Sequence, residues 1–405
     1  MTKMEPFREL ISYEEAKGII LENVKPVERT EKVPLDEACD RVLAEDIVAE
    51  APVPSFARAS MDGYAVKAED TYGASSFRPK NLRIIGAAYP GEPFMGEVGK
   101  GEAVQIATGC PIPRGADSVV MVEFTKEENG IVEVQRPLYP GANVAPRGED
   151  LEEGAIALKA GVHLTPSKVG VLAALGRTAA KVYAKPLVTV ISTGKEVKEV
   201  GSELGEGEIY DINSHTLSAI ASANGATPVR RGIIQDTYEN LRSVIEEAVR
   251  GDMVVFSGGS SVGARDLLFN VVSELGRVLF HGVQLKPGKP TLFGLVQGKP
   301  LFGMPGYPTS CLSNAYLFLV PAVRKMARMP QREPTMVRVP MGHRFVSSSG
   351  RVQFLPVKIR DGKAYQAFKE SGAITSMSEA DGYILVPLNV DVIEEGKEVI
   401  VTFLE

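Results

Sequence analysis

Short apolar runs alternate with helical stretches between Lys185 and Met326, and this alternation constrains the fold more than any other feature of the sequence. The apolar runs are LVTVIST at 187–193, TPVRRGIIQ at 227–235, DMVVFSGG at 252–259 and LFGM at 301–304. Helical patterns lie near 213–223, 237–250, 265–275 and 309–327. Pro321 should kink the last helix. Val/Ile runs separated by helices are typical of parallel strands buried on both faces, so the segment is predicted to form an α/β domain with a parallel sheet.

The remaining chain divides into segments with other patterns, and a length of 405 residues corresponds to roughly three domains. Residues 8–24 predict a helix with Ser12 as its N-cap, and Thr165-Pro166 opens another. Short apolar runs between Gly and Pro predict β structure, with late turns at Asp361-Gly362 and Asp381-Gly382. The resulting plan has a discontinuous N-terminal linker domain at 1–51 and 141–184, an inserted β domain at 52–140, the α/β domain at 185–329 and a C-terminal β-barrel or sandwich at 330–405.

Composition excludes several classes of protein. A net charge of −6 and a pI near 5.6 argue against a surface that tracks nucleic-acid phosphates. The longest apolar run, Tyr316 to Val323, is far shorter than a membrane span of roughly 20 residues. The N-terminal sequence lacks the basic and apolar stretches of a signal peptide, so a cytoplasmic protein is expected. Scattered cysteines and histidines indicate neither a disulfide framework nor a common zinc site.

Ligands of an open parallel sheet bind beyond the carboxyl ends of its strands, and two such connections suit an anion here. One connection is Ser192 to Glu196, with Thr193 and Gly194, and the other is Ser257 to Gly263. Glycines let the backbone approach a ligand, and hydroxyls, N–H groups and the following helix attract phosphate oxygens. A glycine-rich turn alone is equally compatible with an ordinary strand-to-helix connection. Two such loops at one edge favour a site for a phosphorylated ligand.

Charged residues surround these loops in the sequence. Lys286 and Lys289 share a stiff turn and can meet one anion, although such a turn is also common on solvated surfaces. Three carboxylates suggest Mg²⁺, which proteins hold through one or two carboxylates and substrate phosphates: Glu196, Asp236 and Asp266. Asp236 has the alternative role of a helix N-cap. The segment 304–310 should form a pocket wall. Its alternative, purely structural role is to start a helix that Thr309 or Ser310 caps.

Seven motifs taken together resemble the molybdopterin molybdenumtransferase (MoeA) family, which is related to the gephyrin E domain. They are S-M-D-G-Y-A at 60–65, T-G-x-P-I-P at 108–113, R-G-E-D at 147–150, S-T-G-x-E at 192–196, S-G-G-x-S-V-G-x-x-D at 257–266, K-P-G-K-P at 286–290 and P-G-x-P at 305–308. The motifs at 60–65, 108–113 and 147–150 can each be explained alone as a turn. Their shared order spans nearly the whole chain, which makes the resemblance specific.

The resemblance implies an elongated homodimer of four-domain subunits. It also implies that adenylylated molybdopterin and molybdate or tungstate react, with Mg²⁺, to give the molybdenum cofactor and AMP, downstream of a molybdopterin adenylyltransferase partner. The catalytic residues that it implies are Asp62, Thr108, Asp150, Glu196, Asp236 and Asp266, the last three also binding the metal. The residues that it implies for cofactor binding are Thr193, Gly194, Ser257, Gly258, Gly259, Ser260, Ser261, Gly263, Lys286, Lys289, Pro305, Pro308 and Ser310.

Two positions depart from the family pattern. Tyr307 stands where the family often has Asn, and Gly282 stands where a lysine is common, which removes a cationic contact to the oxyanion. Two alternative functions stay open: the preceding adenylyltransferase step, which would consume ATP, and a scaffold that binds molybdopterin and partner proteins without turnover. The residues outside the α/β domain favour the insertion step, and the Asp and Lys set speaks against a purely structural role.

Overall fold

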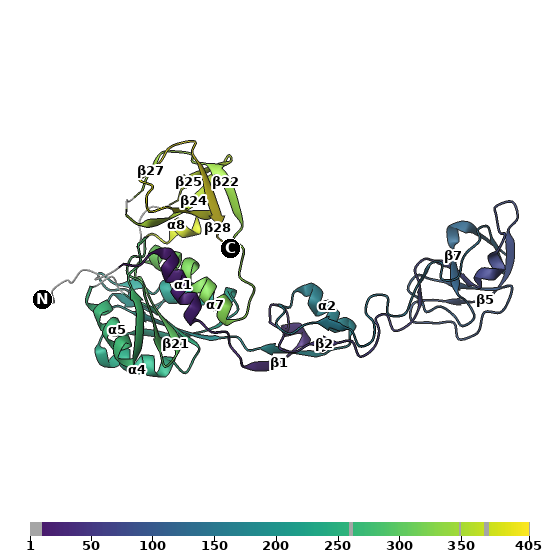
Figure 1. The fold of residues 1–405 in the computed structure, drawn as a ribbon, viewed down its shortest axis with the longest axis horizontal. Helices are drawn as coiled ribbons and strands as arrows, with labels where there is room; N and C mark the ends of the chain where they lie inside the picture. The colour runs from purple at the N-terminus through teal and green to yellow at the C-terminus, as the bar shows by residue number, and fades with distance from the viewer. Residues whose placement is uncertain (1–9, 259–261, 348–349, 368–371, 405) are drawn as a thin grey trace. The chain divides into compact units, whose positions relative to one another are not determined.

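The computed structural model describes residues 10–258, 262–347, 350–367 and 372–404 (Figure 1). The chain forms two compact units. The first unit comprises Met1–Lys32, Asp40–Ala44 and Lys181–Glu405, and the second comprises Val33–Cys39 and Glu45–Ala180. Two paired strands, β1 (Thr30–Pro34) and β12 (Ala179–Tyr183), carry the chain from one unit to the other. The domain boundaries predicted from the sequence stay predictions.

A six-stranded sheet forms the centre of the first unit. Its strand order is β16 (Thr227–Ile234), β13 (Leu187–Thr193), β17 (Met253–Ser257), β21 (Lys299–Met304), β20 (Leu292–Val296) and β18 (Gly276–His281). The first four strands are parallel, as predicted. Strand β20, which was not predicted, is antiparallel to both of its neighbours, so the sheet as a whole is mixed. A tight hairpin joins β20 to β21, and the longer segment 282–291 joins β18 to β20, so no helical crossover is needed at that side of the sheet.

Alternate residues of the central strands enter separate cores on the two faces of the sheet. From β17, Met253 and Val255 join one core, and Val254 and Phe256 join the other. The first core also receives side chains from α1 (Tyr13–Asn23), α3 (Asn213–Ala223), α6 (Pro308–Asn314) and α7 (Val320–Met326), and the second receives them from α4 (Tyr238–Ala248) and α5 (Val262–Leu275). Helices α1 and α7 lie side by side in Figure 1. This arrangement buries the strands on both faces.

Local signals account for most of the helix boundaries. The Ser12 hydroxyl accepts a hydrogen bond from the Glu15 N–H at 3.1 Å, so the predicted N-cap of α1 is confirmed. The long predicted helix near 309–327 is divided into α6, a π-helical turn at Ala315–Leu319, and α7. Pro321 lacks an N–H and its ring collides with the carbonyl of a regular helix, which explains a widened turn at this point. No helix in the described ranges is both long and apolar enough to cross a membrane.

The C-terminal part of the first unit is a sheet with strand order β19 (Leu285–Lys286), β24 (Val352–Arg360), β26 (Gly382–Val386), β28 (Glu398–Phe403) and β22 (Met336–Pro340), while β25 (Lys363–Gln366) pairs with β24. Other elements are β23 (Phe345–Val346), β27 (Val392–Ile393) and α8 (Thr375–Ser378). Asp361 and Gly362 form the predicted turn, both with positive φ. The turn predicted at Asp381-Gly382 was wrong, because Gly382 begins β26 and a Cβ there would lie 2.4 Å from the Thr402 carbonyl oxygen.

The second unit contains a β sheet with strand order β7 (Ser118–Met121), β4 (Gly63–Val66), β6 (Glu102–Ile106), β5 (Lys80–Ala88), β9 (Ile131–Val134) and β8 (Thr125–Glu128). Helix α2 (Pro166–Ala174) begins at the predicted Pro after Thr165. Two small ribbons pair β2 (Ile47–Val48) with β11 (Ile156–Leu158) and β3 (Arg58–Ala59) with β10 (Val144–Ala145). The unit therefore has the β content predicted for its middle portion.

Candidate functional site

The ends of three parallel strands meet at one edge of the central sheet. Ser192 of β13 lies opposite Ser257 of β17, and Ser257 lies opposite Met304 of β21. The segments that follow these strands are therefore neighbours, as the sequence predicted from the two anion-type connections. All three strands run parallel, so their carboxyl ends point to the same side, where ligands of such sheets bind.

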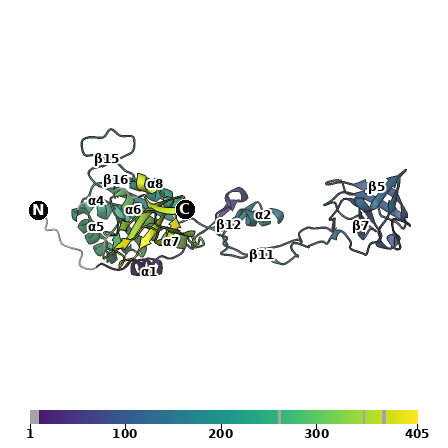
Figure 2. The same ribbon diagram turned by 90° about the horizontal axis from the view of Figure 1, so that it is seen from above.

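A polar pocket opens at this edge. Its lining includes Ser192, Thr193, Glu196, Asp211, Asn213, Ser257, Gly258, Gly306, Tyr307 and Pro308. The residues come from the ends of β13 and β17, from the segment before α3, and from the start of α6. The ribbon of β14 (Val197–Lys198) and β15 (Ile209–Tyr210) adjoins the pocket, and Figure 2 shows the loop that joins these two strands standing away from the sheet. The pocket thus gathers hydroxyl, amide and carboxylate groups.

Several buried polar atoms in this pocket have no hydrogen-bond partner. They are Ser192 Oγ, Asp211 Oδ2 and Asn213 Oδ1, in residues that are each less than 9% exposed. Buried polar groups in proteins are nearly always satisfied by protein, water or ligand. Water or polar ligand groups would satisfy these atoms, which makes the pocket a candidate binding site.

Asn213 ties two of the pocket walls together. Its Nδ2 donates to Ser257 Oγ and to the Gly306 carbonyl oxygen, both at 2.7 Å. Neither Asn213 nor Asp211 was predicted from the sequence. The available signal was the group of polar residues Asp211, Asn213 and Ser214 at the start of a helix, which is equally typical of ordinary capping. The Ser214 N–H does donate to Asp211 Oδ1 at 3.0 Å.

Gly194 allows Glu196 to turn back toward its own loop. The φ angle of Gly194 is +137°, and a Cβ would lie 2.9 Å from the Val197 side chain and 3.1 Å from the Glu196 carboxylate. Only glycine adopts this backbone conformation readily. Gly194, which was predicted as a binding residue, is therefore needed for the backbone conformation of the loop.

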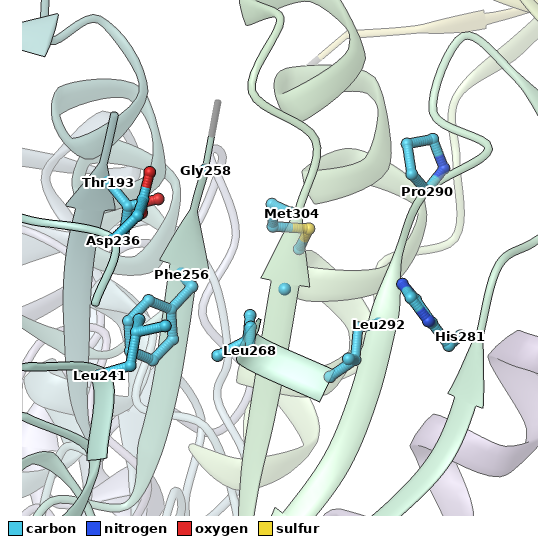
Figure 3. Close-up of a pocket in the computed structure, with 11 residues that line it drawn as sticks. Thr193, Asp236, Leu241, Phe256, Gly258, Leu268, His281, Pro290, Leu292 and Met304 are labelled. Carbon is cyan, nitrogen blue, oxygen red and sulfur yellow. The ribbon is translucent and has the colours of Figure 1, made fainter. Parts of the chain in front are cut away.

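A second pocket with a mostly apolar floor lies next to the polar one and shares Thr193 and Gly258 with it. In Figure 3, Thr193 and Asp236 lie beside one another at one side, and His281 and Pro290 lie at the other. The floor is formed by Leu241, Phe256, Leu268, Leu292 and Met304. Asp236 Oδ1 is buried without a hydrogen-bond partner.

The environment of Asp236 raises the pKa of its carboxyl group. Burial is the largest cause; a hydrogen bond from Thr193 lowers the pKa, the negative Glu196 raises it, and Lys195 lowers it. The alternative role of Asp236 as a helix N-cap was wrong, because the N-cap of α4 is Thr237, whose hydroxyl accepts from the Asn240 N–H. A partly desolvated carboxylate with an unused oxygen and a second carboxylate nearby fits a divalent cation.

Part of the predicted anion loop lies outside the described residues, namely Gly259, Ser260 and Ser261. The structure describes Gly263 and Asp266 only as backbone of α5, so the Asp266 side chain is also outside it. Among the side chains that are described, no group of three His, Cys, Asp or Glu could hold a metal. The predicted set of three metal ligands therefore stays a prediction, and its described members are Glu196 and Asp236.

The turn with the two lysines is firmly held. The Asn314 Nδ2 donates to the Gly288 carbonyl oxygen at 3.1 Å and also to the Thr291 hydroxyl. Gly288 has φ +116°, and a Cβ there would lie 2.1 Å from Asn314 Oδ1. Pro290 lines the second pocket, whereas Lys286 and Lys289 line neither of the two pockets described above.

The segment predicted as a pocket wall contributes Gly306, Tyr307 and Pro308 to the polar pocket. Pro305 and Ser310 are buried beside it and do not line it. The alternative of a cap at Thr309 or Ser310 was wrong: the N-cap of α6 is Tyr307, and the Thr309 hydroxyl donates to the Ala373 carbonyl oxygen at 3.1 Å. The wall thus has the predicted position.

Three predicted residues belong to the second unit: Asp62, Thr108 and Asp150. Asp62 Oδ1 accepts hydrogen bonds from the Thr108 N–H at 2.7 Å and from its hydroxyl at 2.9 Å. These bonds, the backbone one first, lower the pKa of Asp62 and keep it ionised. Asp150 is exposed, and its N–H donates to the Val53 carbonyl oxygen. The structure brings Asp62 and Thr108 into direct contact.

Three family models match successive parts of the chain. The MoeA N-terminal region (domain I and II) matches residues 11–176, a probable molybdopterin binding domain matches 189–325, and the MoeA C-terminal region (domain IV) matches 338–404. Together these models cover most of the sequence.

Individual relatives agree with the family models over nearly their full length. The molybdopterin molybdenumtransferase of Haemophilus influenzae is 31% identical, covering 93% of this chain and 96% of the relative. The enzyme of the same name from Bacillus subtilis is 33% identical, covering 91% and 89%. The crystal structure of a molybdopterin biosynthesis MoeA protein from Pyrococcus horikoshii superposes with a TM-score of 0.84 at 40% identity, covering 98% of this chain and 99% of that one.

Proposed function

This chain belongs to the MoeA family, and from that membership we propose that it is a molybdopterin molybdenumtransferase, which inserts molybdenum into molybdopterin during cofactor biosynthesis. The observation that carries this proposal is the pair of pockets at the carboxyl edge of the sheet, in the segment matched by the molybdopterin-binding model. The Ser257 hydroxyl, which accepts from Asn213, can donate to a phosphate oxygen there. The site and the family therefore point to the same substrate.

The finer form of the proposal concerns the reaction. Adenylylated molybdopterin and molybdate or tungstate react, and AMP leaves as water attacks the phosphoanhydride. Lys286 and Lys289 supply positive charge for the oxyanion or the pterin phosphate. Glu196 and Asp236, with Asp266, would hold Mg²⁺, which neutralises negative charge on phosphate oxygens when bound. Asp62, Thr108 and Asp150 complete the proposed catalytic set.

We also propose a cellular location, an oligomeric state and an upstream partner for the enzyme. It acts in the cytoplasm as a homodimer and receives its substrate from a molybdopterin adenylyltransferase. Light scattering at micromolar concentration tests the dimer, and a monomeric mass would contradict it.

One assay distinguishes the insertion step from its alternatives. The purified protein is incubated with adenylylated molybdopterin and either molybdate or tungstate, with and without Mg²⁺, while AMP release and metal retention are followed. We expect AMP release that depends on the oxyanion and on Mg²⁺. Consumption of ATP in the presence of unmodified molybdopterin would favour the adenylyltransferase step instead. Binding of molybdopterin without AMP release from the adenylylated form would favour a scaffold.

A further inference from the structure

Two acceptor atoms in the polar pocket have no role in the function proposed above. They are Asp211 Oδ2 and Asn213 Oδ1, in residues that are 2% and 8% exposed. Both residues line the pocket together with Ser192, whose buried hydroxyl also has no partner. Asn213 contacts Ser257 at the end of β17, and both residues line the pocket at this edge of the sheet.

Hydrogen bonds to the protein fix which atoms of the two residues remain without a partner. The Gly306 carbonyl oxygen can only accept, so the atom of Asn213 that contacts it must be Nδ2 and the remaining atom must be Oδ1. Asp211 Oδ1 accepts from the Ser214 N–H, which leaves Oδ2 unused. The hydrogen-bonding capacity that remains on these two pocket-lining residues is therefore that of acceptors, with no donor.

A buried carboxylate of this kind requires donors. The ion pairs in the described part of the chain include none to Asp211, and an uncompensated buried charge is strongly unfavourable. A neighbouring guanidinium, that of Arg230, is directed to the Ser214 hydroxyl through Nε at 3.0 Å and to Glu199 through Nη2 at 3.2 Å. The missing donors must come from the ligand or from water.

We propose that Asp211 and Asn213 recognise the pterin ring of the substrate through its 2-amino group and adjacent ring N–H. This inference rests on the proposed function. The pterin edge offers two neighbouring donors, which match two acceptors, whereas the hydrogen-bonding edges of adenine place a ring acceptor beside the amino donor. The Ser192 hydroxyl can donate to the ring carbonyl next to the N–H. Asp211 and Asn213 are thus specificity-determining residues, and the adenylyl group binds elsewhere.

The test compares two ring systems on the full-length protein. Binding of a simple pterin and of lumazine, in which an oxo group replaces the 2-amino group, is measured by ligand fluorescence for wild type and for Asp211→Asn. Losing a hydrogen bond to a charged group weakens binding by roughly 10–100-fold. We expect wild type to prefer pterin by at least about 10-fold and the variant to lose most of this preference. Glu203→Gln, at an exposed carboxylate of the β14–β15 loop, should keep it.

The remaining outcomes are equally informative. An unchanged pterin preference in Asp211→Asn would overturn the assignment, and so would weakened AMP binding with normal pterin binding. Because the preference is a ratio measured on one variant, a partly destabilised preparation still gives a valid answer, and Asn retains an oxygen for the Ser214 N–H. AMP release by wild type is measured separately. A pterin preference without AMP release would therefore reject the proposed function while supporting the pterin site.

Discussion

Asp236 lies in an environment that disfavours the charge of its carboxylate, at a position proposed to bind the metal. Burial and the negative Glu196 raise its pKa, so the native state binds a proton more readily than the unfolded chain does. Stability is consequently lost as the pH rises from the ordinary Asp pKa through the raised one. The ionised carboxylate of Asp236 therefore destabilises the fold at neutral pH, as is common for groups with perturbed pKa values at functional sites.

The Asp236→Asn variant tests this balance. We expect molybdenum insertion to fall by about 10²-fold or more, because the substitution removes a proposed metal ligand, while the melting temperature at pH 7 rises above that of wild type. The difference in melting temperature should vanish below the ordinary pKa of Asp. Glu203→Gln, at an exposed carboxylate of the β14–β15 loop, is the control and should change neither quantity. A variant that is less stable than wild type at pH 7 would contradict this account.

At the level of single residues, the sequence predicted those whose position follows from topology. Thr193 and Ser257 end parallel strands, so their proximity could be inferred without coordinates. Asp211 and Asn213 could not be found in this way, because their burial depends on how α3 packs against the strand ends and the start of α6. Their sequence context resembles a helix cap, which is usually exposed.

The lysine turn depends on a glycine for two separable reasons. Gly288 has φ +116° and has no room for a Cβ beside Asn314, whereas Gly298 has φ +77° and open space around it. We expect Gly288→Ala to destabilise the first unit by about 3 kcal/mol or more and to reduce oxyanion binding, since backbone strain and steric overlap add. Gly298→Ala should cost only about 1 kcal/mol from backbone strain.

Urea unfolding at pH 7 and a molybdate titration measure the two effects of the Gly288 substitution. Gly298→Ala is the control for positive φ alone. Equal losses of stability in the two variants would show that steric overlap with Asn314 adds nothing to the destabilisation caused by Gly288→Ala.

Elements with strong local signals were predicted well, and those fixed by pairing were not. Helices α1, α3 and α4 have clear periodicity, and they appear close to their predicted positions. Strand β20 was missed because its hairpin to β21 turns at Gln297-Gly298, both with positive φ, and a Gln-Gly pair is a weaker turn signal than Asn-Gly. Strand β18 is a short edge strand whose identity depends on its pairing with β20. Local sequence cannot specify such partners.

At the scale of the whole molecule, a clamp at Asp252 secures the N-terminal segment to the central sheet. Both oxygens of Asp252 accept from Arg29 at 2.8 Å, and the Leu187 N–H donates to Oδ2 at 2.9 Å. Burial alone would raise the pKa of Asp252, but Arg29, the Leu187 N–H and Lys299 together lower it. A lowered pKa means that this contribution to stability is present above the ordinary pKa of Asp and is lost as the pH falls through the lowered value.

Calorimetry of Arg29→Met tests the clamp and the division into two units together. We expect at least two thermal transitions, because two compact units need not unfold in one step. The variant should lower the transition temperature of the first unit alone. The free energy of unfolding of that unit should fall by about 1–3 kcal/mol at pH 7 and by less near pH 3. Arg250→Met, at an exposed arginine of the same unit, is the control. A shift in both transitions, or an equal shift at both pH values, would be inconsistent with the clamp.

The pairing of β19 with β24 links the lysine turn to residues far along the chain. Val352 and Gln353 lie opposite Leu285 and Lys286, and the Val352 N–H donates to the Gln284 carbonyl oxygen at 3.0 Å. During synthesis on the ribosome, the parallel strands and the acidic groups of the site emerge first. The turn with both lysines gains its outer partner only after the C-terminal sheet has left the exit tunnel, so a prematurely terminated chain would carry a lysine turn without the support of β24.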